Sequence, residues 1–304
     1  MVDWSQNCWK EMLIYQRKAS IAEDTLDMIA AWLDLKPGMT AVDIGCGLGY
    51  MGYTYWPYFG KGGDYIGVDV NLNLLGEAHG AAEKWAESGQ ALFLAGDAYQ
   101  LPIADNSADL VVCQAVLQHM DKPEDVLAEM TRVARPGGVV FCQEPDNLST
   151  LLSENYTSLP PRTVEEHLLA DKVHRVAVAG RIKLERGDWA VGIKIPKLMH
   201  DLGLRDIRIR KNDRVTCLLP PYDDPLQQIQ LDNIKKQWLN EERHQHWKDA
   251  LKEEFLAGGG TKPEFDRYVE IDTKIMSVFA KQIKDGEYSA CGSGHFYFVK
   301  GVKR

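Results

Sequence analysis

The sequence lacks a basic stripe, a long apolar run and a recognisable leader, and each absence excludes a class of protein. Its 304 residues carry 44 acidic against 35 basic side chains, for a net charge of −9. Nothing in it could neutralise several phosphates of a nucleic acid. No window approaches the apolar length of a membrane span, and the first residues do not read as a secretory signal. We therefore expect a cytoplasmic protein that binds neither nucleic acid nor membrane.

Closely spaced cysteines are also missing. The six cysteines are Cys8, Cys46, Cys113, Cys142, Cys217 and Cys291. With no C-x-x-C pair, they predict neither a zinc site nor structural disulfides. Cys46, Cys113 and Cys142 fall at or just past the ends of predicted strands, and we interpret these three as small buried side chains. A charged run around His244 and His246 could suggest metal binding, but residues two apart point to different faces of a helix, so we predict a solvated surface and no metal.

Short apolar segments typical of strands alternate with helical segments through the first half. The strand-like segments are residues 40–44, 64–69, 91–95, 108–113 and 139–142. Repeated β-α alternation with short connections predicts right-handed crossovers and a doubly wound, Rossmann-like α/β sheet, with a ligand at the carboxyl ends of the strands. The segments 91–95 and 108–113 both have the composition of central strands.

The alternation predicts how the chain is divided. Residues 1–145 form the core with an amino-terminal arm, and residues 191–219 and 291–304 return to it with further strands. Residues 146–190 carry no strand pattern and form an insertion, while residues 220–290 are helical and polar. We expect the two non-core stretches to pack together as a helical cap over the site.

A glycine-dense turn follows the first strand. Gly45 and Gly47 permit backbone amides to approach a ligand closely, and the helix that follows adds its dipole. Residues 47–52 also fit the G-x-G-x-x-G dinucleotide fingerprint, and Asp69 stands near the position of its ribose-binding acid. An NAD(P)-dependent oxidoreductase therefore remains an alternative.

Acidic residues at the ends of three strands favour another cofactor. Asp43 lies inside the first strand, just before the turn, where its charge would repel a pyrophosphate and attract a cationic amino-acid tail. Asp69 and Asp97 end the second and third strands. Three acids beside one glycine turn indicate a cationic cofactor without phosphates.

Over roughly residues 35–145 the chain resembles the class I S-adenosylmethionine-dependent methyltransferases. The segments 101–110 and 135–138 are similar to the sequences that usually precede the fourth and fifth strands in this family. Residues 114–120 resemble a bacterial branch of the family that acts on small molecules. The resemblance implies a seven-stranded sheet with its last strand antiparallel. It also implies S-adenosylmethionine as cofactor and S-adenosylhomocysteine as product.

The resemblance further assigns cofactor contacts to the ends of the first four strands. These contacts are Asp43, Gly45, Cys46 and Gly47 for the methionine part, Asp69, Val70 and Asn71 for the ribose and adenine, Gly96, Asp97 and Ala98 for the adenine edge, and Gln114 closing the site. It places Tyr15 and Arg17, in the amino-terminal arm, near the methionine carboxylate.

Methyl transfer is an in-line displacement, so alignment in a dry pocket contributes most of the catalysis and a base is optional. His119 is our first candidate base because it follows the fourth strand and its ordinary pKa is near neutrality. Glu144, after the fifth strand, is the second. The alternatives are a helix-capping or packing role for His119 and a strand-end cap or lid contact for Glu144.

The function that we predict is methylation of a small-molecule acceptor. A non-catalytic cofactor-binding protein is a further alternative. No pattern in the sequence indicates the oligomeric state.

Overall fold

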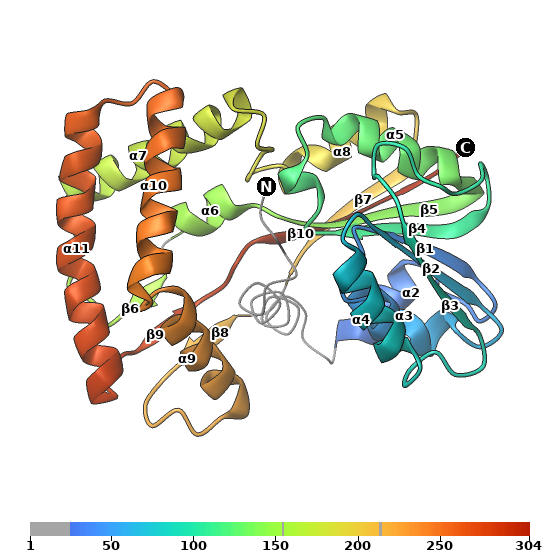
Figure 1. Cartoon of the computed structure of the whole chain (residues 1–304), viewed down its shortest axis with the longest axis horizontal. Helices are drawn as coiled ribbons and strands as arrows, with labels where there is room; N and C mark the ends of the chain where they lie inside the picture. The colour runs from blue at the N-terminus through green and yellow to red at the C-terminus, as the bar shows by residue number, and fades with distance from the viewer. Residues whose placement is uncertain (1–24, 154, 213–214) are drawn as a thin grey trace.

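The computed structural model describes residues 25–153, 155–212 and 215–304. They form two lobes, a sheet covered by helices and a second lobe built mainly of helices (Figure 1). None of the helices among these residues combines the length and the apolarity needed to cross a bilayer.

The first lobe contains a seven-stranded sheet in the order β3-β2-β1-β4-β5-β10-β7. The strands are β1 (Thr40–Ile44), β2 (Asp64–Asp69), β3 (Gln90–Ala95), β4 (Ala108–Gln114), β5 (Ala134–Pro145), β7 (Arg205–Lys211) and β10 (Phe296–Val302). The strands from β3 to β5 pair in parallel, whereas β10 runs antiparallel to both of its neighbours. The predicted Rossmann-like sheet with an antiparallel last strand is therefore confirmed.

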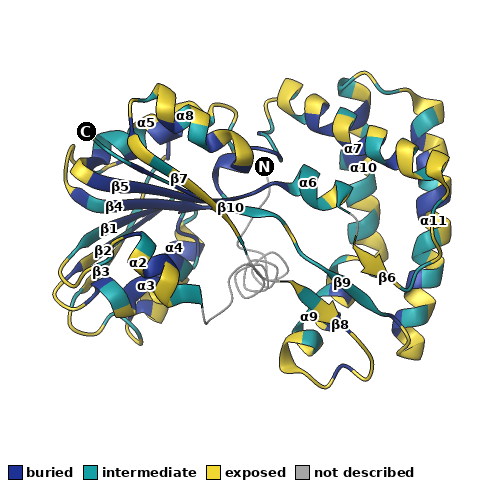
Figure 2. Cartoon of the chain, turned by 180° about the vertical axis from the view of Figure 1, so that it is seen from behind, coloured by how far each residue is buried: buried dark blue, intermediate teal, exposed yellow. Residues whose placement is uncertain are grey.

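Strand β3 corrects one expectation. The segment 91–95 was predicted to be central, but β3 lies at the edge of the sheet beside β2, and Leu92 is exposed. Its apolar composition has a local cause, because Phe93 packs against the rings of Tyr65 and His79. The prediction holds for β4, which lies in the middle of the sheet and is almost wholly buried (Figure 2).

Helices cover both faces of this sheet. They are α2 (Leu26–Trp32), α3 (Tyr50–Phe59), α4 (Leu72–Ala82), α5 (Pro123–Val133) and α8 (Ile195–Asp201), with the short 3-10 helices η2 (Leu117–His119) and η3 (Gly192–Lys194). Helices α5 and α8 pack on one apolar cluster and helices α2 and α3 on another. Burial on both faces explains the nearly continuous apolar strands.

The second lobe, which we call the cap, is built mainly from residues of the two stretches expected to lie outside the core, but strand β8 and part of β9 come from the stretches 191–219 and 291–304 that were expected to return to it. It contains α6 (Asn147–Leu152), α7 (Val164–Lys183), α9 (Pro225–Gln237), α10 (Glu241–Ala257) and α11 (Lys262–Asp285), with a small sheet of β6 (Tyr156–Thr157), β8 (Thr216–Leu218) and β9 (Ala290–Gly292). The two-residue strand β6 lies in the stretch where no strand was expected, since two residues give no periodicity. Side chains of α7, α10 and α11 share one apolar cluster.

Two glycines allow α7 and α10 to approach closely. A Cβ atom at Gly180 would overlap the carbonyl oxygen of Glu254, and one at Gly258 would overlap that of Val176. At the same crossing Arg181 pairs with Glu254 at 2.8 Å, and both side chains are largely buried. The cap is therefore held by close backbone contact and a buried ion pair as well as by apolar packing.

Candidate functional site

The glycine turn after β1 is tied to the end of β2. The amides of Gly45 and Cys46 both donate to the carbonyl oxygen of Val68, at 2.7 and 3.1 Å. The amide of Gly47 donates to Oδ2 of Asp69 at 2.8 Å. Gly45 has a φ of +64°, and a Cβ atom there would lie 2.6 Å from a methyl group of Val116. Glycine is thus required by both conformation and space.

Asp69 organises two loops at once. While Oδ2 accepts from Gly47, Oδ1 accepts from the amide of Asn71 at 2.8 Å. The Asn71 side chain in turn caps α4 by accepting from the amides of Asn73 and Leu74. The carboxylate of Asp69 is therefore fixed in position. Each oxygen has a second lone pair for another donor.

Asp43 lies beneath the turn, inside the core. Its side chain is only 1% exposed and accepts a hydrogen bond of 2.6 Å from the hydroxyl of Tyr65. Burial, together with the charge of Asp43, raises the pKa of Tyr65 well above its usual value, so the tyrosine stays a donor. Burial likewise raises the pKa of the neighbouring Cys46 thiol, which makes it a poor nucleophile.

The end of β3 supplies the third acid. The amide of Gly96 donates to the carbonyl oxygen of Asp69 at 3.1 Å, which joins this loop to β2. Asp97 is exposed and accepts from the amide of Tyr99 at 2.9 Å, whereas Ala98 is buried. Because β3, β2 and β1 are neighbours in the sheet, Asp97, Asp69 and Asp43 lie along one edge.

Gln114 at the end of β4 extends the same edge. Its side chain is 4% exposed, and its Oε1 atom has no hydrogen-bond partner among the described residues. A buried amide oxygen without a partner is costly, and such an atom indicates a missing donor. The exposed Val70 also lies at this edge, after β2. Tyr15 and Arg17, assigned to the amino-terminal arm, lie outside the described residues.

Glu144 has a clear positioning role. Its fully buried carboxylate accepts from the amides of Val116, Leu117 and Gln118 at 2.8, 3.0 and 3.3 Å, and so caps η2. Burial raises the pKa of Glu144 to about 7, although the amide bonds act in the opposite direction. The geometry matches the capping alternative, because both oxygens are engaged by the backbone.

His119, the last residue of η2, meets the cap. It is exposed to solvent, and partial desolvation by the surrounding protein lowers its pKa, with a further contribution from the positive charge of Arg181. The turn at Gly187 also packs on η2, since a Cβ atom there would overlap the carbonyl oxygen of Gln118. His119 is therefore neutral at physiological pH, and a neutral imidazole can accept a proton.

Sequence reasoning missed the residues that the cap brings to this region. Arg181 of α7 lies 5.0 Å from the centre of the Trp189 ring, in addition to its pairing with Glu254. Asn147 donates to the side chain of Gln118 at 2.7 Å. No local pattern signals the pairing of Arg181 with Glu254 or of Asn147 with Gln118, because these partners are far apart in sequence.

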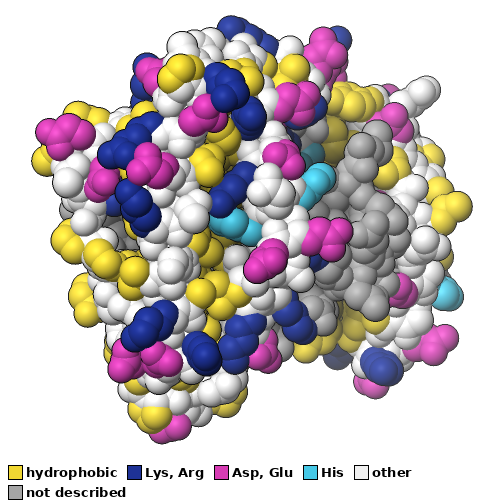
Figure 3. Space-filling model, turned by 60° about the vertical axis from the view of Figure 1, so that its left-hand side comes forward, with side chains coloured by type: hydrophobic (Ala, Val, Ile, Leu, Met, Phe, Trp, Pro, Cys, Tyr) yellow, Lys and Arg dark blue, Asp and Glu magenta, His cyan; other side chains and the backbone are white. Residues whose placement is uncertain are grey.

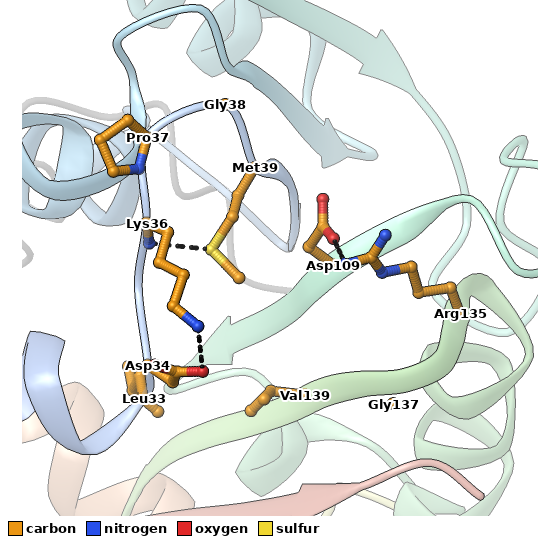
Figure 4. Close-up of a pocket in the computed structure, with 10 residues that line it drawn as sticks. All are labelled: Leu33, Asp34, Lys36, Pro37, Gly38, Met39, Asp109, Arg135, Gly137 and Val139. Atoms are coloured by element: carbon orange, nitrogen blue, oxygen red, sulfur yellow. Dashed lines mark hydrogen bonds and ion pairs between the residues drawn. The ribbon is translucent and has the colours of Figure 1, made fainter.

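One pocket of about 340 Å³ lies at the opposite edge of the sheet (Figure 4). It is lined by Leu33, Asp34, Lys36, Pro37, Gly38, Met39, Asp109, Arg135, Gly137 and Val139. Its charged groups pair with each other, Arg135 with Asp109 and Lys36 with Asp34. This pocket lies near the amino ends of β1 and β4, so the length of the strands separates it from the glycine turn.

Metal binding finds no support in the described part of the chain, where no group of three His, Cys, Asp or Glu side chains has the arrangement of a metal site. His244, considered above for such a role, instead faces Asp272, with Nε2 and Oδ2 separated by 3.3 Å. Lys248 approaches the same carboxylate at 3.3 Å. These groups join α10 to α11.

Comparison with known proteins finds similarity over the part of the chain that carries the site. Residues 42–142, a third of the chain, match the family model described as a methyltransferase domain. A Streptomyces fradiae protein of 37.1 kDa encoded in a transposon is 34% identical over 167 residues, covering 55% of this chain and 47% of that protein. The demethylmenaquinone methyltransferase of Bacillus cereus is 32% identical over 133 residues, covering 44% of this chain and 54% of the enzyme. This chain thus spans about half the length of these relatives.

Solved structures share the fold at low sequence identity. The YcgJ protein of Bacillus subtilis is 17% identical, with a TM-score of 0.53, and the match covers 93% of this chain and 99% of that protein. The phosphoethanolamine N-methyltransferase 2 of Haemonchus contortus, solved with S-adenosyl-L-methionine, is 18% identical with a TM-score of 0.52, covering all of this chain and 60% of the enzyme. The match of residues 42–142 to the methyltransferase-domain model, together with this shared fold, confirms the resemblance to the class I S-adenosylmethionine-dependent methyltransferases.

Proposed function

We propose that this chain transfers a methyl group from S-adenosylmethionine to a small-molecule acceptor. The observation that carries the proposal is the edge where Asp43, Asp69 and Asp97 end three adjacent strands, with the Gly47 amide bonded to Asp69 at 2.8 Å. An acidic edge beside a tight glycine turn suits a cationic ligand with hydroxyl and amine donors. The methyltransferase-domain match over residues 42–142 agrees with this chemistry.

The residues at this edge fit the cofactor's parts. Asp69 can accept from the ribose hydroxyls with its remaining lone pairs, and Asp97 can accept from the adenine amine. The buried Oε1 of Gln114, which has no partner among the described residues, offers an acceptor for a further donor. The buried charge of Asp43 favours a cationic amino-acid portion above it. When bound, the cofactor supplies an electrophilic methyl group.

The same features disfavour the dinucleotide alternative. The carboxylate of Asp43 beneath the turn would repel a pyrophosphate. Gly52 is the third glycine of the fingerprint-like spacing. Packing alone explains a glycine at this position, since a Cβ atom there would lie 2.7 Å from Tyr65 and 2.8 Å from Trp85. The spacing of residues 47–52 is thus explained without a bound dinucleotide.

The catalytic contribution of the protein is mainly positional. Glu144 orders residues 116–118 through three amide hydrogen bonds, and so holds His119 at the junction of the core and the cap. For an acceptor that loses a proton, the neutral imidazole of His119 is the base that we propose. Its low pKa makes it a weak base, so alignment of the acceptor contributes more than proton transfer.

Three observations favour a small acceptor. Two similar proteins are named for small molecules, demethylmenaquinone and phosphoethanolamine. The net charge of −9 disfavours a polyanion. On the face drawn in Figure 3, acidic and basic side chains of the described residues are interspersed instead of forming one basic area.

The test is transfer of an isotope-labelled methyl group from S-adenosylmethionine into a cell extract that has been separated into small metabolites, protein and nucleic acid. We expect label in the metabolite fraction, with formation of S-adenosylhomocysteine. Label confined to protein or nucleic acid would contradict a small acceptor, while tight cofactor binding without any transfer would favour a non-catalytic binding protein. With the acceptor identified, His119→Ala should lower the single-turnover rate if His119 acts as the base, and an unchanged rate would remove that role.

A further inference from the structure

Two cysteines that are 74 residues apart in sequence meet in the small sheet of the cap. Cys217 of β8 and Cys291 of β9 are direct cross-strand partners, and their sulfur atoms lie 2.8 Å apart. Cys217 is exposed and Cys291 is partly buried. No spacing in the sequence indicates that they pair, because neither lies in a short Cys-x-x-Cys arrangement.

Their backbone positions suit a disulfide. Directly opposed residues of antiparallel strands have Cα atoms about 4.5 to 5.5 Å apart, which lies within the range of about 4.4 to 6.8 Å found for disulfides. The sulfur atoms would have to close only from contact to bonding distance. The exposure of Cys217 gives a reagent access to the pair.

The chain contains a contrasting pair in the core. Cys113 of β4 and Cys142 of β5 are also register partners, but both are fully buried in parallel central strands. Burial raises the pKa of the Cys113 thiol well above its usual value. The two pairs therefore differ in their access to a reagent, so the core pair serves as an internal control.

Cys217 and Cys291 lie where the cap joins the core. Strand β8 follows β7 along the chain, and β9 precedes β10, while β7 and β10 are neighbours in the core sheet. Two connections between the core and the cap thus carry these cysteines (Figure 1). A bond between them would join both connections and enclose α9, α10 and α11 in one covalent loop.

We propose that Cys217 and Cys291 form a reversible thiol–disulfide site that reacts with low-molecular-weight disulfides and braces the cap. The thiolate of Cys217 attacks one sulfur of the external disulfide, forming a mixed disulfide and releasing one thiol. The thiolate of Cys291 then attacks the sulfur of Cys217, forming the protein disulfide and releasing the second thiol. The two protein sulfur atoms are oxidised by two electrons, the external disulfide is reduced by two, and the two thiol protons leave with the released thiols. This site is independent of the proposed methyl transfer.

The test incubates the full-length protein with glutathione disulfide, blocks the remaining thiols, and maps peptides by mass spectrometry without reduction. We expect a linked peptide pair containing Cys217 and Cys291, its loss on treatment with dithiothreitol, and blocked free thiols at Cys113 and Cys142. The oxidised protein should show a rise in Tm on the order of 5 °C.

Single variants separate this chemistry from unspecific oxidation. Cys291→Ser should stop at a glutathione adduct on Cys217, and Cys217→Ser should give no linked pair and no rise in Tm. Separate adducts on both cysteines of the unmodified protein, or a linked pair joining Cys217 to another cysteine, would overturn the proposal.

Discussion

The edge of the core sheet and the interior of the cap both use charged residues, but they use them differently. At the core edge, Asp69 accepts from backbone amides of two loops, and each of its oxygens has a second lone pair for a further donor. In the cap, Arg181 and Glu254 pair with each other across a helix crossing. The proposed binding site at the core edge is therefore made of single residues and backbone, whereas this charged pair of the cap holds two of its helices together.

This difference implies that cofactor binding at the core edge and the stability of the cap depend on different residues. The core edge is fixed by strand ends and tight turns, so a substitution in the cap should leave cofactor binding nearly unchanged. The cap is fixed by helix contacts, so its stability should depend on residues that are far from the cofactor. Substitutions in each lobe test that division.

The largest effect is expected from Gly180→Val. The new side chain would force α7 away from α10, because even a Cβ atom overlaps the carbonyl oxygen of Glu254. We expect the free energy of unfolding to fall by about 4 kcal/mol, more than is usual for overpacking because the backbones of two helices must separate, as measured by denaturant titration. Gly80→Ala, at an exposed position of α4 with open space around the Cβ, is the control and should change stability by less than about 1 kcal/mol. A matching loss of S-adenosylmethionine affinity in Gly180→Val would break the division between the lobes.

Glu144→Ala tests whether the buried carboxylate holds η2, the segment of the core that meets the cap. Its removal leaves the amides of Val116, Leu117 and Gln118 without their acceptor in a buried place. We expect a loss of about 3 kcal/mol in the free energy of unfolding, together with faster hydrogen exchange at residues 116–118. Unchanged exchange at these amides would show that the carboxylate does not hold η2.

The raised pKa of Glu144 makes stability depend on pH. Between the ordinary carboxyl pKa of 4.5 and about 7, the folded state keeps a proton that the unfolded state releases, so stability should fall as pH rises through this window. The expected contribution is on the order of 3 kcal/mol. It should appear as a difference between the protein and its Glu144→Gln variant when unfolding is measured near both ends of the window. A constant difference across the window would contradict the shifted pKa.

The smallest effect is expected from Asp97→Ala. Asp97 is exposed, so the substitution should leave folding intact and weaken S-adenosylmethionine binding about tenfold, the equivalent of one lost hydrogen bond to a charged group. Asp64→Ala is the matched control, because Asp64 is an exposed acid at the opposite end of β2. Equal effects of the two substitutions would mean that Asp97 contributes only general charge.

The core was predictable because its signals are local. The strand, the glycine turn and the following helix occupy consecutive residues, and Asp43, Asp69 and Asp97 each lie at a strand end that the apolar pattern marks. The cap was predictable only as helical composition. Gly180 meets Glu254, and Cys217 meets Cys291, through contacts between segments more than seventy residues apart. No periodicity encodes such partners.

Within the core, two expectations from the sequence were changed by contacts between distant parts of the chain. Segment 91–95 has the apolar composition of a central strand, but the order of the sheet places β3 at its edge. The acid of Glu144 was recognised as a strand-end group, yet its three amide partners come from a loop that precedes it by more than 25 residues. Residue type and position in the sequence therefore identified candidate residues for the site. The packing of distant segments determined which groups those residues contact.

The central claim is that the edge marked by Asp69 binds S-adenosylmethionine. The most direct measurement is calorimetric titration of the protein with S-adenosylmethionine, S-adenosylhomocysteine and NADH, repeated on Asp69→Ala and on Asp64→Ala. The account predicts saturable binding of the first two ligands, at least tenfold weaker in Asp69→Ala and unchanged in Asp64→Ala. Binding of NADH without binding of S-adenosylmethionine would contradict it.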